Sequence, residues 1–378
     1  IRDYKVTGVQ TCALPILSTC LLKKVFISAL LVLLSTFVAL LIGELTIRAL
    51  YKDKIVLFPR YFTDRWYGQY HLRRMRPSMN FTHTSVDGEF HFHTNSQGFR
   101  NQEEISYQKS KGEVRVLVLG DSHTFGYEVN QQETYSAVAQ ELLRKNGLNA
   151  TVINAGLSGT GTAEQLVFFE QEGINYQPDY VVLGFFSNDF DDNLKSGFFE
   201  LNGDSLLVKN KEHIPGVQLQ NFIYQFGLIR WLSEESYLYN FAFNTVWDFF
   251  KNRSLQKERL KLDESVLGNE GIVDIKAQHL ERCILKRLRK QTIGKTKLIF
   301  LDIPTYKGTS SIPDSLLPDF RTYSDAFIDY PSIQLEVEKS GLTHVPHGQR
   351  HISAATHAIL GNKIATYIAR DRQPLKAQ

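Results

Sequence analysis

The run Val-Arg-Val-Leu-Val-Leu-Gly-Asp-Ser-His-Thr-Phe-Gly, residues 114–126, carries most of the information about the fold. Its first seven residues are almost all apolar, which is typical of a strand buried on both faces of a parallel sheet. A tight Gly-Asp-Ser turn follows, and a helical pattern begins after it. This order places Ser122 at the carboxyl end of a strand, with its backbone N–H near a helix N-terminus that stabilises developing negative charge.

Three further buried strands are predicted over residues 150–156, 180–186 and 297–304. Amphipathic helical patterns separate them, including one that opens with a capping box at Thr162 and one that follows Ser353. Strands that alternate with helices indicate an α/β fold with a parallel sheet covered on both faces. Ligands of such sheets bind beyond the carboxyl ends of the strands, so we expect the chemistry just after residues 120, 156 and 186.

Polar residues with a catalytic pattern occupy these positions. Gly159 follows the second strand and Asn188 follows the third, and with the Ser122 N–H they would form a three-donor oxyanion hole. Serine is a poor nucleophile without a base, and His351, just before the last helix, is placed to supply one. Asp121, beside the serine, is a supporting residue of the same turn.

These four blocks resemble the SGNH (GDSL-like) serine hydrolase superfamily, with Ser122, Gly159, Asn188 and His351 at its motif positions. The resemblance covers roughly residues 111–192 and 296–370. It implies a flavodoxin-like three-layer α/β/α sandwich with a short parallel sheet, ester hydrolysis by a Ser–His centre, and neither metal nor cofactor. An upstream strand followed by a turn is similar to a membrane-anchored, uncharacterised subgroup; it carries Asn95, Gly98, Phe99 and Arg100.

One departure from the family pattern concerns the acid that orients the histidine. The family places an aspartate three residues before the histidine, where this chain has Gly348. Three interpretations stay open: a Ser–His dyad, an acid from elsewhere, or an inactive protein. The candidate acids are Asp302, Asp325 and Asp329. In serine proteases the loss of this acid costs about 10⁴ in rate, so the departure matters.

The remaining histidines and a group of acids have weaker functional interpretations. His123 is expected at the cleft rim, whereas His344, His347 and His357 compete with His351 for the role of base. A zinc site and a polar strand face are the two interpretations of His83, His91 and His93. A cation site and a helix cap are those of Asp189, Asp191 and Asp192.

The stretch Val25–Gly43 contains no charged residue and as a helix would rise about 28 Å, close to the thickness of a bilayer core. An uncleaved single-pass anchor is the favoured interpretation; a signal peptide and a buried core helix are the alternatives. Lys23 and Lys24 favour a cytoplasmic N-terminus, and Arg48 and Lys52 on the other side weaken that argument. Family resemblance places the catalytic domain outside the cytoplasmic membrane.

The expected organisation has four parts. Residues 1–22 are interpreted as an artefact with a lost N-terminus, because residues 6–16, VTGVQTCALPI, look like a translated sequencing adapter. Residues 23–48 form the anchor, residues 49–110 a juxtamembrane segment with a β element, and residues 111–372 the hydrolase domain. An insertion over about 193–295 is expected to be mostly helical, and either covers the sheet or acts as a substrate lid.

Composition limits the classes of partner. A net charge of +3 does not favour nucleic acid, and three cysteines cannot form a disulfide framework. The sequence therefore predicts an esterase for an acylated small molecule, glycan or lipid, with the membrane as partner of the N-terminal helix. The alternatives are an O-acyltransferase for surface glycans and an inactive glycan-binding module. The sequence leaves the oligomeric state open.

Overall fold

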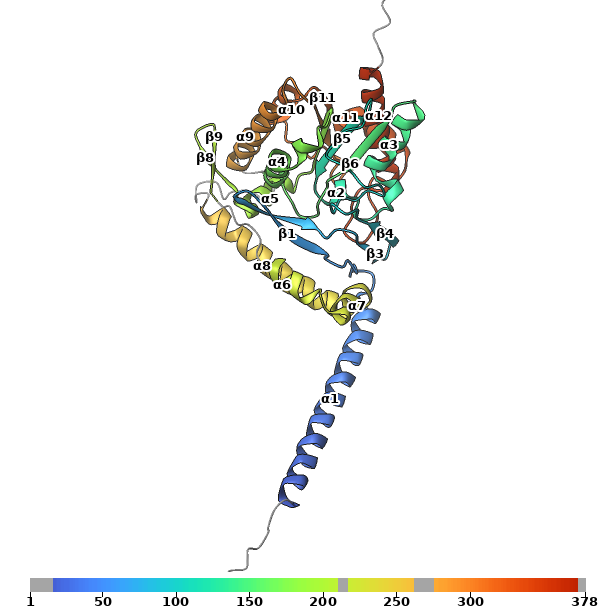
Figure 1. Cartoon of the computed structure of the whole chain (residues 1–378), viewed down its shortest axis with the longest axis vertical. Helices are drawn as coiled ribbons and strands as arrows, with labels where there is room; N and C mark the ends of the chain where they lie inside the picture. The colour runs from blue at the N-terminus through green and yellow to red at the C-terminus, as the bar shows by residue number, and fades with distance from the viewer. Residues whose placement is uncertain (1–15, 210–216, 262–274, 373–378) are drawn as a thin grey trace, which may run out of the picture. The chain divides into compact units, whose positions relative to one another are not determined.

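The computed structural model describes residues 16–209, 217–261 and 275–372. The chain divides into two units, Ile1–Tyr51 and Lys52–Gln378. The described part of the first unit is a single helix, α1 (Ile16–Tyr51), and the second unit contains all the strands (Figure 1). The predicted adapter sequence lies outside the described residues except for Ile16.

A five-stranded parallel sheet forms the centre of the second unit. Its order is β11-β10-β7-β5-β6. The strands are β5 (Val114–Gly120), β6 (Ala150–Asn154), β7 (Tyr180–Phe185), β10 (Lys297–Asp302) and β11 (Ala326–Ile328). The first four are the predicted strands; β11 was not predicted, because three residues are too few to show a period.

Helices cover both faces of this sheet, because alternate strand residues face opposite sides. Leu117 and Leu119 pack in one apolar cluster with α4 (Thr162–Gln171), α9 (Ile275–Thr292) and α10 (Leu317–Tyr323). Val116 and Val118 pack in another with α3 (Tyr135–Lys145), α11 (Tyr330–Lys339) and α12 (Ala354–Arg372). The predicted three-layer α/β/α sandwich is therefore confirmed (Figure 1).

The segment before the sheet forms two antiparallel hairpins, β1 (Phe62–Tyr67) with β2 (Tyr70–Met75) and β3 (Asn80–Ser85) with β4 (Gly88–His93). The predicted turn follows β4. Gly98 lies there at φ +80°, and a Cβ on it would meet the Met75 carbonyl oxygen at 2.5 Å, so glycine is required.

Arg100, just after this turn, is buried and connects it to the loop after Ser122. Its guanidinium donates hydrogen bonds to the carbonyl oxygens of Phe125 and Val129, each at 2.7 Å. It also lies 3.7 Å from the centre of the Phe92 ring. The upstream hairpins therefore hold the loop that carries the serine.

The region between β7 and β10 contains more than helices. It comprises α5 (Asp189–Ser196), the hairpin β8 (Phe199–Asn202) and β9 (Ser205–Val208), then α6 (Val217–Ile223), α7 (Gly227–Glu235), α8 (Tyr237–Lys261) and α9. The buried side chains of α9, including Leu280 and Leu288, belong to the same apolar cluster as strand residues of the sheet. Although α9 falls inside the expected insertion of 193–295, it packs as a covering helix of the sandwich.

Candidate active site

Ser122 lies in the turn between β5 and the short helix α2 (Ser122–Phe125). Gly120 ends the strand at φ +154°, and a Cβ there would meet the Thr124 Oγ1 at 1.8 Å. Asp121 caps α2 by accepting a hydrogen bond from the His123 N–H at 2.9 Å. Burial raises the pKa of the Asp121 carboxyl to about 6. The turn therefore presents the serine through a backbone that only glycine allows.

His351 lies against Ser122. The imidazole Nε2 is 2.8 Å from the Ser122 Oγ, and both side chains are almost completely buried. This distance suits a hydrogen bond in which the hydroxyl donates to a neutral imidazole. Of the histidines that the sequence left in competition, His351 is the one whose ring contacts the serine.

Glu128 completes a row of three hydrogen-bonded side chains. Its Oε2 lies 3.2 Å from the His351 Nδ1, and its carboxylate also accepts the backbone N–H groups of Gln349 at 3.0 Å and of His351 at 3.1 Å. Burial alone would raise the pKa of Glu128, but the imidazole and these N–H donors outweigh it and hold the pKa below its usual value. The carboxylate is therefore ionised at neutral pH and fixes the ring with Nδ1 as the donor.

None of the three aspartates proposed from the sequence contacts His351 in the described structure. Asp302 accepts hydrogen bonds from Ser310, Ser311 and Tyr330 in the loops after β10 and β11. Asp325 pairs with Arg289, and Asp329 caps α11 through the Ser332 N–H. These carboxylates hold local turns together, and the expectation that one of them orients the histidine is wrong.

Gly348 leaves room for the Glu128 carboxylate beside His351. It lies at φ +52°, and a Cβ on it would be 1.9 Å from the Glu128 Oε1. An aspartate at this position, as in the family pattern, would overlap the Glu128 carboxylate. The glycine is the signal that sequence reasoning could have used: a missing acid with a glycine in its place indicates a carboxylate from another loop.

The other two oxyanion candidates lie at the same edge of the sheet. Gly159 is exposed at φ +72° in the loop after β6, and its carbonyl accepts a hydrogen bond from the Arg73 Nη2 at 2.7 Å. Asn188 is partly buried after β7, and its Nδ2 donates to the Asp192 Oδ2 at 3.3 Å. Gly120 and Gly184 are paired across β5 and β7, so the segments carrying Ser122 and Asn188 leave the sheet side by side.

The acids after β7 make local contacts in the structure. Asp189 is fully buried and accepts the Phe186 N–H at 2.9 Å, and burial raises the pKa of its carboxyl well above the usual value. Asp192 pairs with Lys195 at 2.8 Å. Both lie in the first turn of α5, as does Asp191, where negative charge is favoured; the N-cap residue is Asn188, and its side chain makes no capping hydrogen bond.

The remaining histidines have other partners. His123 is buried rather than at a rim, and burial lowers its pKa well below the usual value. Burial also lowers the pKa of His344 to about 4 and that of His357 to about 3. His347 lies on the surface, with its Nδ1 2.9 Å from Asp87. In the described part of the chain the histidine that is hydrogen-bonded to the Ser122 Oγ is His351, and these four histidines have other partners.

The three histidines of the β3–β4 hairpin do not converge on a metal. His83 pairs with Phe90 in the ladder, and its buried Nδ1 lies 2.6 Å from the Tyr127 carbonyl oxygen. His91 and His93 lie at ladder positions that alternate with the His83–Phe90 pair, so their side chains point to the face of the hairpin opposite to that of His83. Within the described ranges, the group with metal-ligand geometry is Asp204, His279 and Cys283, on the β8–β9 turn and α9.

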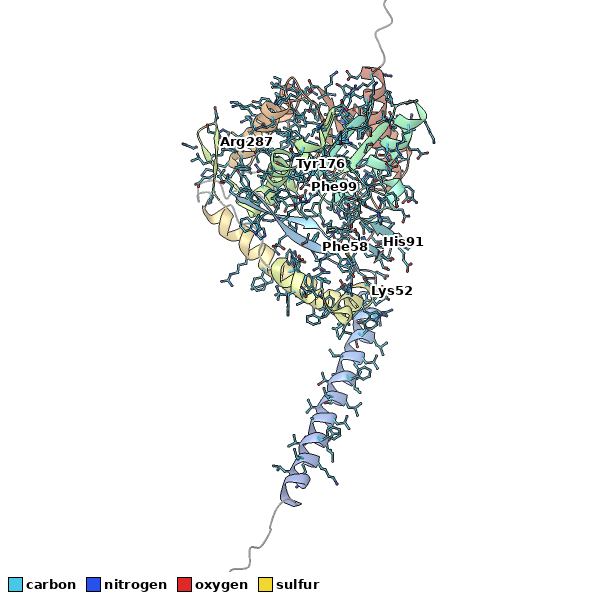
Figure 2. The ribbon with its side chains drawn as sticks, viewed as in Figure 1. Lys52, Phe58, His91, Phe99, Tyr176 and Arg287 are labelled. Atoms are coloured by element: carbon cyan, nitrogen blue, oxygen red, sulfur yellow. The ribbon has the colours of Figure 1, made fainter. Side chains whose placement is uncertain are left out.

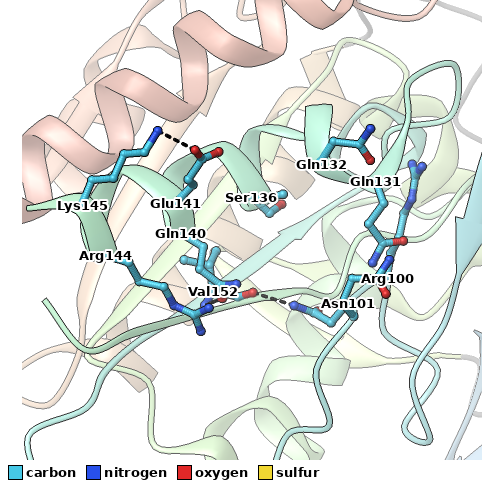
Figure 3. A pocket seen from close by; sticks show the side chains of 12 residues that line it. Arg100, Asn101, Gln131, Gln132, Ser136, Gln140, Glu141, Arg144, Lys145 and Val152 are labelled. Carbon is cyan, nitrogen blue, oxygen red and sulfur yellow. Dashed lines mark hydrogen bonds and ion pairs between the residues drawn. The ribbon is translucent and has the colours of Figure 1, made fainter.

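A pocket of about 500 Å³ lies beside α3 (Figure 3). Most of its lining residues are of polar types, and they include Asn101, which donates to the Val152 carbonyl at 2.8 Å, and Glu141 with Lys145. Ser122, Asn188 and His351 are not among its lining residues. This pocket is therefore separate from the candidate active site.

An α/β fold with a serine held against a histidine is an arrangement found in serine hydrolases. Residues 118–248 match the model of the GDSL-like lipase/acylhydrolase family.

Curated and solved proteins give more distant likenesses. An arylesterase of Vibrio mimicus is 31% identical over 80 residues, which span 21% of this chain and 40% of the relative. A lipase/acylhydrolase from Enterococcus faecalis is 15% identical, covering 70% of this chain and 100% of that one, with a TM-score of 0.38. An acetylxylan esterase from Geobacillus stearothermophilus is 16% identical, covering 72% and 99%, with a TM-score of 0.34.

Proposed function

We propose that the chain is a serine esterase in which Ser122, His351 and Glu128 form the catalytic triad. The observation that carries this proposal is the continuous row of contacts from the Ser122 Oγ through the imidazole to the buried carboxylate. The match to the family model supports it, and so does the arylesterase relative, although the alignment spans less than half of that protein. The inactive-module alternative arose because the sequence shows no acid three residues before His351. Glu128, which contacts the His351 ring, is the acid that we propose in its place.

The proposed reaction has two steps. The Ser122 Oγ attacks the acyl carbon while the His351 Nε2 takes the hydroxyl proton, and the alcohol leaves with that proton. A water molecule then attacks the acyl-enzyme, His351 takes its proton, and the serine is regenerated as the carboxylic acid departs. The Glu128 carboxylate stabilises the imidazolium in both steps, because the positive charge forms beside a buried negative one.

The oxyanion would be held by the N–H groups of Ser122 and Gly159 and by the Asn188 amide. In the structure this amide donates to Asp192, so we propose that it turns to the substrate oxygen when an ester binds. Arg73 supports this part of the site, because its hydrogen bonds to the Ser158 and Gly159 carbonyls fix the loop that carries the Gly159 N–H.

We also propose that α1 anchors the enzyme, with the second unit on the extracytoplasmic side and an acylated glycan or lipid as substrate. The most apolar 18-residue window of Leu21–Tyr51 has a mean hydropathy of 2.8 and contains no buried residue. A helix whose apolar side chains face no protein surface is suited to lipid.

The test is hydrolysis of p-nitrophenyl acetate by the full chain in detergent, with fluorophosphonate labelling as the second readout. We expect turnover and labelling in the wild type, and loss of both in Ser122→Ala. His351→Ala should lose turnover while the protein stays folded. Turnover that survives Ser122→Ala would refute the mechanism. Products formed with a sugar alcohol present would show whether the acyl group goes to water or to a hydroxyl, which separates the esterase from the acyltransferase.

A further inference from the structure

The helices α6, α7 and α8 carry an unusual concentration of exposed apolar side chains. Of the 18 large hydrophobic residues of the second unit that are exposed in the described structure, nine lie within residues 219–250. Soluble surfaces rarely gather so many large apolar groups in one short stretch. We call these nine the apolar face; they are Leu219, Phe222, Phe226, Leu228, Trp231, Phe241, Val246, Phe249 and Phe250.

The apolar face is not an incomplete part of the core, because the same helices are already packed against the rest of the second unit through other side chains. Tyr224 is 1% exposed, and its ring centre lies 5.5 Å from that of Tyr61. Asn240 is buried and donates to two carbonyls of the preceding turn, and the half-buried Trp247 lies under the Arg60 guanidinium at 5.3 Å. The same three helices therefore carry exposed apolar side chains and are also packed against an ordered interior; Figure 2 draws the side chains on their ribbons.

The chain itself brings these helices close to the membrane. Lys52 follows α1 directly, and Phe58 to Phe62 already belong to the apolar cluster that includes Tyr224, with Ile223 and Ile229 packed against it. A chain spans at most about 3.6 Å per residue, so these contacts lie within roughly 40 Å of the end of α1 whatever the direction of that helix. If α1 crosses a bilayer, the contacts that hold α6 and α7 therefore lie within reach of the membrane surface.

We propose that the apolar face inserts into the interfacial region of the bilayer that anchors α1, so that the hydrolase domain lies on the membrane. This proposal rests on the anchoring part of the proposed function and is independent of the esterase mechanism. The chemistry fits a lipid surface, because Phe, Leu and Trp on helices lying in the interface bury about 5–10 Å deep, with Trp at the headgroup level. A second copy of the chain and a protein partner are the competing occupants.

Two tryptophans provide a matched test. Trp231, on the apolar face, is 59% exposed, and Trp66, on β1 and stacked on His71, is 52% exposed. The full chain is reconstituted in vesicles of phosphatidylcholine and phosphatidylglycerol whose acyl chains are brominated or not. Trp66→Phe with Trp247→Phe leaves Trp231 as the reporter, and Trp231→Phe with Trp247→Phe leaves Trp66. Both proteins carry α1, so the difference between them reports on the face and not on the anchor.

We expect brominated lipid to quench Trp231 emission at least twofold, with a shift to shorter wavelength, and to leave Trp66 nearly unchanged. Equal quenching of both reporters, or none of Trp231, would overturn the proposal. A Trp231 shielded from water but not quenched would indicate a second copy or a protein partner and would also overturn it. Circular dichroism of both variants shows that they are folded, and membrane extraction shows separately whether α1 is an anchor.

Discussion

Glu128 is the residue for which sequence reasoning and structure differ most. Ser122 and His351 were predicted from their places at a strand end and before the last helix, and the structure brings them to 2.8 Å. The acid could not be predicted in this way, because its contact with the ring depends on how two loops meet in space. The role of each residue in catalysis stays a prediction until it is tested.

We expect Glu128→Gln to lower kcat by roughly 10³-fold, because a neutral amide cannot stabilise the imidazolium and can orient the ring in the wrong tautomer. The measurement is kcat and KM for p-nitrophenyl acetate in detergent. Asp329→Asn is the matched control, because asparagine caps a helix as well as aspartate does, and Asp329 caps α11 and pairs with the exposed Arg321 without contacting His351. An Asp329→Asn enzyme as impaired as Glu128→Gln would contradict the assignment of the acid.

Arg73 leads to a second prediction at this scale. Its Nη2 holds the carbonyls of Ser158 and Gly159 at 2.6 and 2.7 Å, and the guanidinium lies 4.6 Å from the centre of the Phe62 ring. We expect Arg73→Met to lower kcat on the order of tenfold, with KM changed less, because a loosened loop misplaces a donor that acts mainly in the transition state. A change in KM alone would mean that Arg73 contributes to binding and not to the oxyanion.

At the scale of elements, long periodic segments were predicted and short or irregular ones were not. Strands β5, β6, β7 and β10 are continuous apolar runs, and each lies within one residue of its expected start. The β8–β9 hairpin has strands of four residues each, too short for a pattern to emerge. The packing of α9 on the sheet could not be predicted, because the sequence pattern of an amphipathic helix is the same in an insertion as in a helix that covers the core.

The contact between α9, α4 and α5 gives an element-scale prediction. Glu281 of α9 is fully buried and accepts hydrogen bonds from Thr162 of α4 and from Asn193 of α5, and burial raises its pKa to about 7. A carboxyl with a raised native pKa binds its proton more tightly in the folded state than in the unfolded state. Its contribution to the free energy of unfolding is therefore complete below about pH 4.5 and is lost as the pH rises through about 7. The free energy of unfolding falls by about 3 kcal/mol over this pH range.

We therefore expect Glu281→Gln to flatten the fall in the free energy of unfolding between pH 5 and pH 8. Denaturant unfolding followed by circular dichroism at both pH values measures the change. Glu141→Gln, at an exposed position on α3, is the control and should keep the wild-type pH dependence. A Glu281→Gln protein with an unchanged slope would show that the carboxyl does not titrate in this range.

The whole molecule has two units of very different character, one apolar helix and one packed sandwich. Hydropathy alone predicted the helix, but whether it is an anchor or a signal sequence depends on processing. We expect the full chain, expressed in a bacterium, to stay in the membrane fraction after extraction with alkaline carbonate. We also expect the second unit to be digested by protease added to spheroplasts. Release into the soluble fraction would contradict the anchor, and protection from protease would reverse the proposed sidedness.

The long separation between the triad residues has a consequence for the timing of activation. Ser122 and Glu128 lie in one short loop, whereas His351 follows the serine by 229 residues. A ribosome that makes 5–20 residues per second needs about ten seconds or more to cover that interval. During this time the serine has no base. If the chain is exported as we propose, the nascent chain carries a serine that cannot yet react, and esters on the near side of the membrane are not hydrolysed before the segment with His351 has packed against the serine.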